Sequence, residues 1–150
     1  MHRTIAIGIL LVLAGCSSQP EAPVLGAWQG TQPGSNVLSE KNVDLVLRGL
    51  PDAQGGQYCL ATGEHDPSDR VNQGQPRTGG AWARSQRVID GRSVTVFHLN
   101  DTLPDDISSY ALMPDGTLRG LNPNGTLGTT QEASLYALSP VPAGPRRGRV

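Results

Sequence analysis

The chain of 150 residues carries 12 basic and 13 acidic side chains, which gives a formal net charge of −1 at pH 7. A charge so close to zero supplies no strong field that would attract nucleic acid or an acidic substrate, so we expect neither as a partner. The length suits a single domain. Aromatic residues make up only 4% of the chain, and we therefore expect a core built mostly of valine, leucine and alanine.

Residues 1–15 have the pattern of a secretory signal peptide. Arg3 supplies one fixed positive charge, and the run Ile5–Ala14 that follows is apolar apart from Gly8. A permanent transmembrane helix needs about 20 residues, so this run is too short to span a membrane and fits the apolar region of a signal peptide. We therefore expect residues 1–15 to be removed from the mature protein.

The residues Leu13-Ala14-Gly15-Cys16 resemble the lipobox of bacterial lipoproteins. The resemblance implies that the Cys16 sulfur receives a diacylglyceryl group, that cleavage makes Cys16 the first residue, and that its new amine is acylated with a fatty acid such as palmitate. Several acyl chains together, at about 0.8 kcal/mol per buried methylene, hold a protein on a membrane. The alternative is an ordinary cleaved signal peptide in which Cys16 has no role.

The segment after the lipobox bears on where the protein resides. Ser17 occupies the position at which a residue other than Asp is compatible with export to the outer membrane. Residues 16–24 are small, polar and proline-rich after the cysteine, and predict a tether that holds the domain off the membrane. The resemblance thus implies a lipid-anchored protein of the cell envelope that faces the periplasm, at the outer membrane, where another envelope protein is a possible partner.

Lipidation of Cys16 would leave Cys59, the second cysteine of the chain, without a partner in the same chain. In an oxidising compartment an odd cysteine is buried and inert, reactive, or paired with another chain. We favour the buried state, because a lone cysteine behaves as a small hydrophobic residue.

From Leu25 onward the sequence predicts an all-β domain over residues 25–139. No window of a dozen residues shows a helical period, and short apolar runs are bounded by Gly, Pro, Asn and Asp. The predicted strands cover residues 25–31, 42–48, 57–62, 80–89, 93–99, 107–113, 117–121 and 134–138. About eight strands joined by local turns predict a small antiparallel meander, barrel or barrel-like and lipocalin-like, because closure removes exposed edges.

Two local features are more specific. Asp90-Gly91 separates two predicted strands and is the dipeptide best suited to the positive φ angles of a type I′ hairpin. The proline-rich residues 140–150 are expected to form no packed strand and to be a disordered basic tail, whose positive charges could touch anionic lipid. These charges belong to Arg146, Arg147 and Arg149.

The order of signals along the domain resembles the N-terminal domain of the NlpE-type copper-resistance lipoproteins, which are linked to surface and envelope-stress sensing. The residues that carry the resemblance are Trp28, Gly30 and Pro33; Val43, Leu45 and Leu47 with Tyr58 and Leu60; Gly80 and Trp82; and Tyr110, Leu112, Thr117, Leu118, Leu121, Gly125, Tyr136 and Leu138. The family carries a Cys-x-x-Cys pair after its first proline, at a spacing that suits Cu(I). Here Pro33 is followed by Gly34-Ser35-Asn36-Val37, so we expect no metal at this motif.

Two polar clusters were weighed as metal sites and rejected. Glu64-His65-Asp66, with Asp69 nearby, lies on a chain whose adjacent residues point in different directions and which offers no cysteine or second histidine at ligand spacing. The group Asn100, Asp101, Asp105 and Asp106 lacks the ordered spacing and the turn glycine of a calcium loop. We therefore expect no metal and no cofactor.

Catalytic signatures are also missing from the sequence, which predicts a protein that is not an enzyme. His98 alternates with Val94 and Val96 and shares their face of a strand. Trp28 and Trp82 suit the core, although Trp28, Trp82 and His98 are also the candidates for a ligand pocket, since an eight-stranded barrel can hold one small ligand. Three functions stay open: a binding or sensing lipoprotein that acts through protein contacts, a carrier of a small apolar ligand, and a periplasmic inhibitor of a hydrolase.

Overall fold

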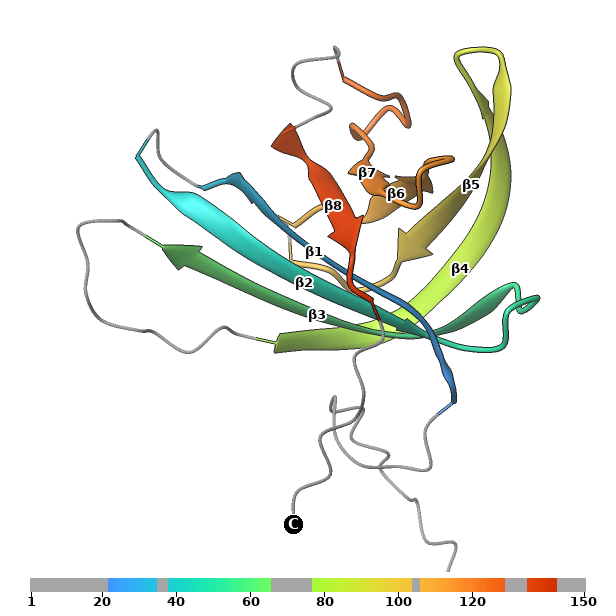
Figure 1. Ribbon diagram of the computed structural model, residues 1–150, viewed down its shortest axis with the longest axis horizontal. Helices are drawn as coiled ribbons and strands as arrows, with labels where there is room; N and C mark the ends of the chain where they lie inside the picture. The colour runs from blue at the N-terminus through green and yellow to red at the C-terminus, as the bar shows by residue number, and fades with distance from the viewer. Residues whose placement is uncertain (1–21, 35–37, 66–76, 104–105, 129–134, 143–150) are drawn as a thin grey trace, which may run out of the picture.

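The structure, a computed structural model, describes residues 22–34, 38–65, 77–103, 106–128 and 135–142. Within these residues eight strands pair in sequence order and close into one antiparallel barrel (Figure 1). The predicted all-β meander of about eight strands is confirmed. No helix in the described part of the chain is long and apolar enough to cross a membrane.

Most strand positions agree with the prediction, and the observed strands are generally longer in the first half of the chain. Their bounds are β1 Val24–Pro33, β2 Glu40–Arg48, β3 Gly55–His65, β4 Arg77–Ile89, β5 Arg92–Leu99, β6 Ser109–Leu112, β7 Leu118–Gly120 and β8 Ala137–Pro140. The last strand begins three residues later than residues 134–138 predict, and β3 extends three residues beyond the end of the predicted strand 57–62.

Strand β4 forms the main bend of the barrel. Its first half pairs with β3, from Arg77 to Ala83, and its second half pairs with β5, from Trp82 to Ile89. Trp82 therefore has a partner on both sides, and Figure 1 shows the strand curving from the lower wall to the upper one. Because of this bend, the successive hairpins curve around and close into a barrel.

The hairpin between β4 and β5 has the predicted turn. Asp90 has a φ of 50° and Gly91 a φ of 75°, so both central residues take the positive angles of a type I′ turn. Ile89 pairs directly with Arg92 across the turn, which leaves a two-residue connection. The prediction of a tight type I′ hairpin is confirmed.

The expectation that Pro140 and the residues after it form no strand is wrong at its first position. Pro140 ends β8 and pairs with Trp28 of β1, and the Val141 N–H donates to the Ala27 carbonyl over 2.8 Å. Because successive N–H groups of a strand point to opposite sides, the proline nitrogen faces away from β1. On that side β7 pairs only with Ala137 and Leu138, so Pro140 interrupts no hydrogen bond of the sheet. Residues 143–150 lie outside the described residues.

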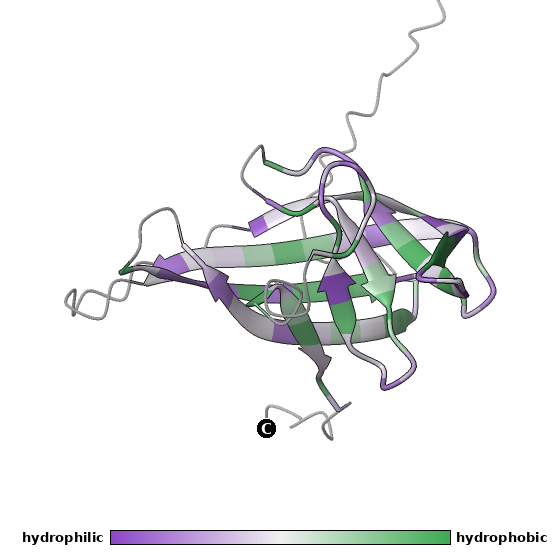
Figure 2. Ribbon diagram, turned by 90° about the horizontal axis from the view of Figure 1, so that it is seen from above, coloured by the Kyte–Doolittle hydropathy of each residue, from purple (hydrophilic) through white to green (hydrophobic). Residues whose placement is uncertain are grey.

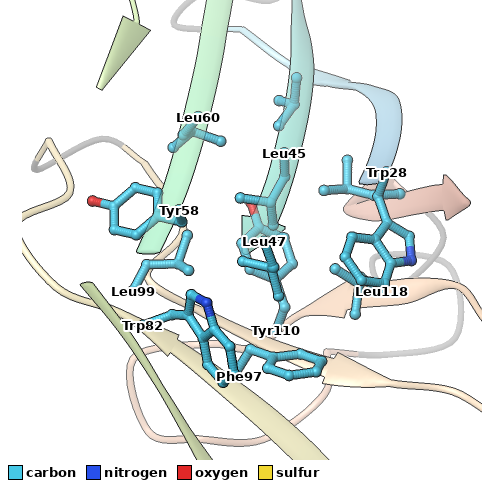
Figure 3. Close-up of a cluster of buried hydrophobic side chains, with 12 residues drawn as sticks. Trp28, Leu45, Leu47, Tyr58, Leu60, Trp82, Phe97, Leu99, Tyr110 and Leu118 are labelled. Carbon is cyan, nitrogen blue, oxygen red and sulfur yellow. The ribbon is translucent and has the colours of Figure 1, made fainter. Parts of the chain in front are cut away.

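The barrel interior is filled by large side chains that alternate with outward ones along each strand (Figure 3). Its members are Trp28, Val43, Leu45, Leu47, Tyr58, Leu60, Trp82, Phe97, Leu99, Tyr110, Leu118 and Leu138. The Trp82 and Phe97 rings meet edge to face with centroids 5.5 Å apart. Aromatic residues contribute far more of this core than their share of the sequence suggested, because each one buries a large area and fills the wide centre of a barrel.

A second, smaller cluster lies on the outer wall. Val96 and Ala111 are completely buried although their neighbours Phe97 and Tyr110 face the interior, because Leu121 and the residues after β7 cover them. Figure 2 shows hydrophobic (green) and hydrophilic (purple) residues interspersed along the strands of the barrel. The outer wall of β5 and β6 is thus covered by its own chain, and the candidate site lies beside this cover.

Side chains close both ends of the interior. At one end Lys41 of β2 forms an ion pair with Asp106, and the Tyr58 hydroxyl donates to the Asn100 carbonyl. At the other end the Arg84 guanidinium lies 5.6 Å from the centre of the Trp82 ring, and its Nη1 donates to the Pro51 carbonyl over 3.0 Å. The interior is therefore packed along its length.

Candidate functional site

A pocket of about 540 Å³ opens on the outer wall, where β4 and β5 meet the segments before β6, after β7 and before β8. This volume is within the range of about 300–1,000 Å³ that small-molecule sites occupy. Ile107, Leu121, Pro123 and Tyr136 provide its apolar walls. Its polar groups come from Arg87, His98, Asp106, Ser109, Asn122 and Asn124.

His98 is the site residue that the sequence singled out and that the structure places in this pocket. It shares a face with Val94 and Val96, as the alternation predicted, and the structure shows that this is the outer face of the barrel. Its Nε2 lies 2.8 Å from the Ser85 hydroxyl, and its Nδ1 lies 3.0 Å from the Ser109 hydroxyl. A neutral imidazole has one donor and one acceptor nitrogen, so one serine donates to the ring and the other accepts from it.

Two effects lower the pKa of His98. Burial disfavours the charged imidazolium, and the positive Arg87 guanidinium repels it. The imidazole is therefore neutral near pH 7, which preserves the two complementary hydrogen bonds to serine.

The turn that borders the pocket repeats a turn elsewhere in the barrel. In Asn122-Pro-Asn-Gly-Thr126, Asn124 Oδ1 accepts from both the Thr126 N–H and its hydroxyl, and Gly125 has a φ of 78°. In the turn between β6 and β7, Asp115 Oδ1 accepts from the same two groups of Thr117. These hydrogen bonds lower the pKa of Asp115. The pocket turn differs because it uses a neutral amide, which retains an NH₂ group as a donor.

Arg87 lies at the edge of the pocket against this turn. A Cβ added to Gly125 would be 2.2 Å from Arg87 Nη1, so the glycine makes room for the guanidinium. Arg87 is exposed, and among the residues that the structure describes no carboxylate lies within ion-pair distance of it. The pocket therefore offers one positive charge without a counter-charge.

Asp106 is the negatively charged residue of the pocket lining. Its side chain is 3% exposed, and one oxygen, Oδ1, pairs with Lys41. The other oxygen, Oδ2, is buried and has no hydrogen-bond partner among the residues that the structure describes. An acceptor in that state costs free energy until a donor reaches it.

The two tryptophans named with His98 lie elsewhere. Trp28 and Trp82 are 8% and 2% exposed and belong to the interior core. Each indole N–H donates over 2.9 Å to a backbone carbonyl, that of Gly116 for Trp28 and that of Arg48 for Trp82. Neither ring lines the outer pocket, so the structure separates the tryptophans from His98 by the thickness of the barrel wall.

The rejected metal clusters are only partly described. Glu64 and His65 end β3, whereas Asp66, Asp69 and Asp105 lie outside the described residues. Among the residues that the structure covers, no three histidine, cysteine or acidic side chains gather as a metal site would require.

Cys59 does not match the expectation of an unpaired, buried cysteine. It is half-buried on β3, opposite Val46, and it is disulfide-bonded. The chain has one other cysteine, Cys16, which lies outside the described residues together with Arg146, Arg147 and Arg149.

Sequence reasoning missed Arg87, Asn124 and Tyr136 as members of one site. Arg87 and Tyr136 were placed only on predicted strands, and Asn124 was assigned no role. The one available signal was the repetition of Pro-x-Gly-Thr at residues 114–117 and 123–126, with Asp in the first copy and Asn in the second.

Comparisons with the models of protein families, with characterised proteins and with solved structures find no match for this chain. The resemblance to the NlpE-type domain therefore stays a prediction from the sequence.

Proposed function

We propose that the chain is an envelope-anchored, non-enzymatic lipoprotein that binds another envelope protein through the projecting β4–β5 hairpin. The observation that carries the proposal is the pairing of this hairpin. Pairing of β4 with β3 ends at Ala83, and β5 pairs with β6 only from Val96 to His98. One more backbone hydrogen bond follows on the β3 side, from the Arg84 N–H to the Gln54 carbonyl over 2.8 Å. Farther toward the hairpin turn the two strands pair only with each other, among the residues described.

An open strand edge is a surface that another chain can pair with. Its backbone groups are ready to extend the sheet, which is how many domains bind an extended segment of a partner. Figure 1 shows the hairpin rising beyond the rest of the barrel. The exposed side chains of this hairpin include Val88, which is 77% exposed, and two arginines, Arg87 and Arg92. An apolar residue flanked by arginine suits a protein interface, where arginine is enriched.

The packed interior supports binding at the outer surface over transport inside the barrel. A small apolar ligand inside would have to displace side chains such as Trp82 and Phe97, which are 2% and 3% exposed. The lipobox at Cys16 supplies the predicted anchor, and residues 17–24 the predicted tether, so the domain would reach partners near the membrane.

Site-specific cross-linking tests this proposal in living cells. A photoreactive amino acid in place of Val88 is expected to give one recurrent protein adduct, whereas the same residue in place of Leu50 should give none. Leu50 is the matched control because it is also apolar and is 60% exposed, in the turn between β2 and β3.

The adduct must also depend on the surface chemistry of the hairpin. With the partner identified and purified, Val88→Asp is expected to weaken its binding about tenfold or more, because the change places a charge at the centre of the contact. Equal adducts from both positions, or a partner that binds the Val88→Asp variant as tightly as the wild type, would refute the proposal.

A further inference from the structure

We infer that the outer-wall pocket is a binding site for a saccharide, a neutral ligand with several hydroxyl groups on a partly apolar ring. This inference shares Arg87 with the hairpin but does not depend on the proposed protein partner. It rests on the polar groups that the pocket combines and on its formal charge.

The polar groups of the pocket need a ligand that both donates and accepts. Arg87 can only donate, and it has no carboxylate partner within the described chain. Asn122, also in the lining, has an amide oxygen that can only accept. The Asn124 oxygen is used by the turn, so its amide contributes donors. A hydroxyl group has one donor and two acceptor positions and can satisfy each of these groups.

The charges of the pocket argue against a small anion or a small cation as its ligand. A small anion would find one positive group, the exposed Arg87 side chain, and a single solvent-exposed ion pair contributes little to binding. A small cation would meet the guanidinium of Arg87 and gains little from Asp106, whose charge Lys41 compensates. His98 adds no charge near pH 7, since burial and Arg87 lower its pKa. A neutral ligand is thus the best match.

The apolar walls fit the carbon faces of a sugar ring. Tyr136 and Pro123 line the pocket on the side of the turn, and Ile107 and Leu121 line it on the side of the barrel. Ligand sites commonly combine such walls with a few polar groups that fix orientation. The volume of about 540 Å³ holds one or two sugar rings with their hydration.

The repeated turn supplies a sharp pair of variants. Asn124→Asp keeps the oxygen that accepts from Thr126, so the turn is retained, but it replaces the amide donor with a carboxylate oxygen. Asp115→Asn is the reciprocal change in the equivalent turn, which does not line the pocket. Both residues are exposed, and the folded state of each variant is visible in its own NMR spectrum.

The experiment is an amide NMR titration of the isotope-labelled mature protein in a detergent without a sugar headgroup. The probes are N-acetylglucosamine and glucose, with inorganic phosphate and methylamine as the anion and cation controls. We expect saturable shifts for a sugar at His98, Leu121 and Gly125. Asn124→Asp should weaken this binding about tenfold, which is the loss of one ligand hydrogen bond, and Asp115→Asn should leave it unchanged.

A peptidoglycan disaccharide and a lipopolysaccharide core oligosaccharide then distinguish two sources of the sugar. Binding of either one more tightly than the single sugars supports the inference. Three results would overturn it: shifts with phosphate or methylamine but with no sugar, no shift at concentrations that saturate a millimolar site, or sugar binding that Asn124→Asp does not weaken. Cross-linking at Val88 is unaffected by any of these results, so this inference and the proposed protein contact fail independently.

Discussion

Replacing Trp82 with alanine is expected to lower the free energy of unfolding by about 3–5 kcal/mol, the cost of deleting a large aromatic side chain from a packed core. Trp82 is 2% exposed and meets the Phe97 ring edge to face at 5.5 Å. It also lies at the bend of β4, opposite both Gly56 and Leu99. Its removal would empty the point at which the two halves of the barrel join. Urea denaturation of both proteins, followed by circular dichroism, measures the difference.

Two control variants identify the cause of this loss. Trp82→Phe keeps most of the apolar contact but removes the N–H that donates to the Arg48 carbonyl, and we expect it to cost about 1–3 kcal/mol. Val88→Ala changes an exposed residue of the same strand and should stay within about 0.5 kcal/mol of the wild type. If Trp82→Ala costs no more than Val88→Ala, the packing described for the barrel interior is wrong.

Replacing Lys41 with methionine is expected to cost about 3–5 kcal/mol, because it leaves the Asp106 carboxylate buried without its cation. The two side chains are 15% and 3% exposed, so water screens the pair little. The ion pair also holds the connection between β5 and β6 against the first residues of β2. The same denaturation measurement applies.

A double-mutant cycle separates the ion pair from other roles of Lys41. Asp106→Asn alone should also destabilise the barrel, since it removes the carboxylate that compensates the partly buried lysine charge. The double variant Lys41→Met with Asp106→Asn should cost much less than the sum of the two, because no buried charge is left unpaired. Additive costs would show that the two residues act independently.

The sequence predicts the fold best where local pattern and tertiary packing agree. Val43, Leu45 and Leu47 recur at every second position of their strand, and all three enter the barrel core. Asp90-Gly91 specifies its hairpin through backbone angles alone, without help from the rest of the chain. Such signals depend on a few neighbouring residues, and a single sequence contains them in full.

Features that depend on distant residues were out of reach. The bend at Trp82 exists because β3 and β5 each pair with a different half of β4, and neither half differs in its own pattern. Closure of the barrel depends on two residue pairs between β1 and β8, one of which uses Pro140. Pro140 can join β8 because β7 does not extend to the side that its nitrogen faces. The sequence around a proline does not reveal how far a neighbouring strand extends.

The candidate site shows the same limit. Alternation placed His98 on one face with Val94 and Val96 but did not show that this is the outer face, and its partners Ser85 and Ser109 come from the two neighbouring strands. Tyr136 and Asn124 reach the pocket from separate segments around β7 and β8. Trp28 and Trp82 were candidates only because tryptophan is common in ligand sites, and both belong to the barrel core.

The two cysteines bear directly on the proposed anchor. A sulfur that carries a diacylglyceryl group is a thioether and cannot also form a disulfide. Cys59 is disulfide-bonded in the structure, and Cys16 is the only other cysteine of the chain. For Cys16 the lipid anchor and a disulfide to Cys59 therefore exclude each other, and they leave different covalent masses.

Intact-mass spectrometry of the protein extracted from membranes tests the proposed lipoprotein most directly. We expect a chain that begins at Cys16 and carries the added mass of a diacylglyceryl group and an amide-linked fatty acid, unchanged by a reducing agent. A chain that carries no lipid mass and gains two hydrogens on reduction would contradict the lipid anchor. Its mass would show Cys16 and Cys59 joined as a disulfide, with residues 1–15 either removed or retained.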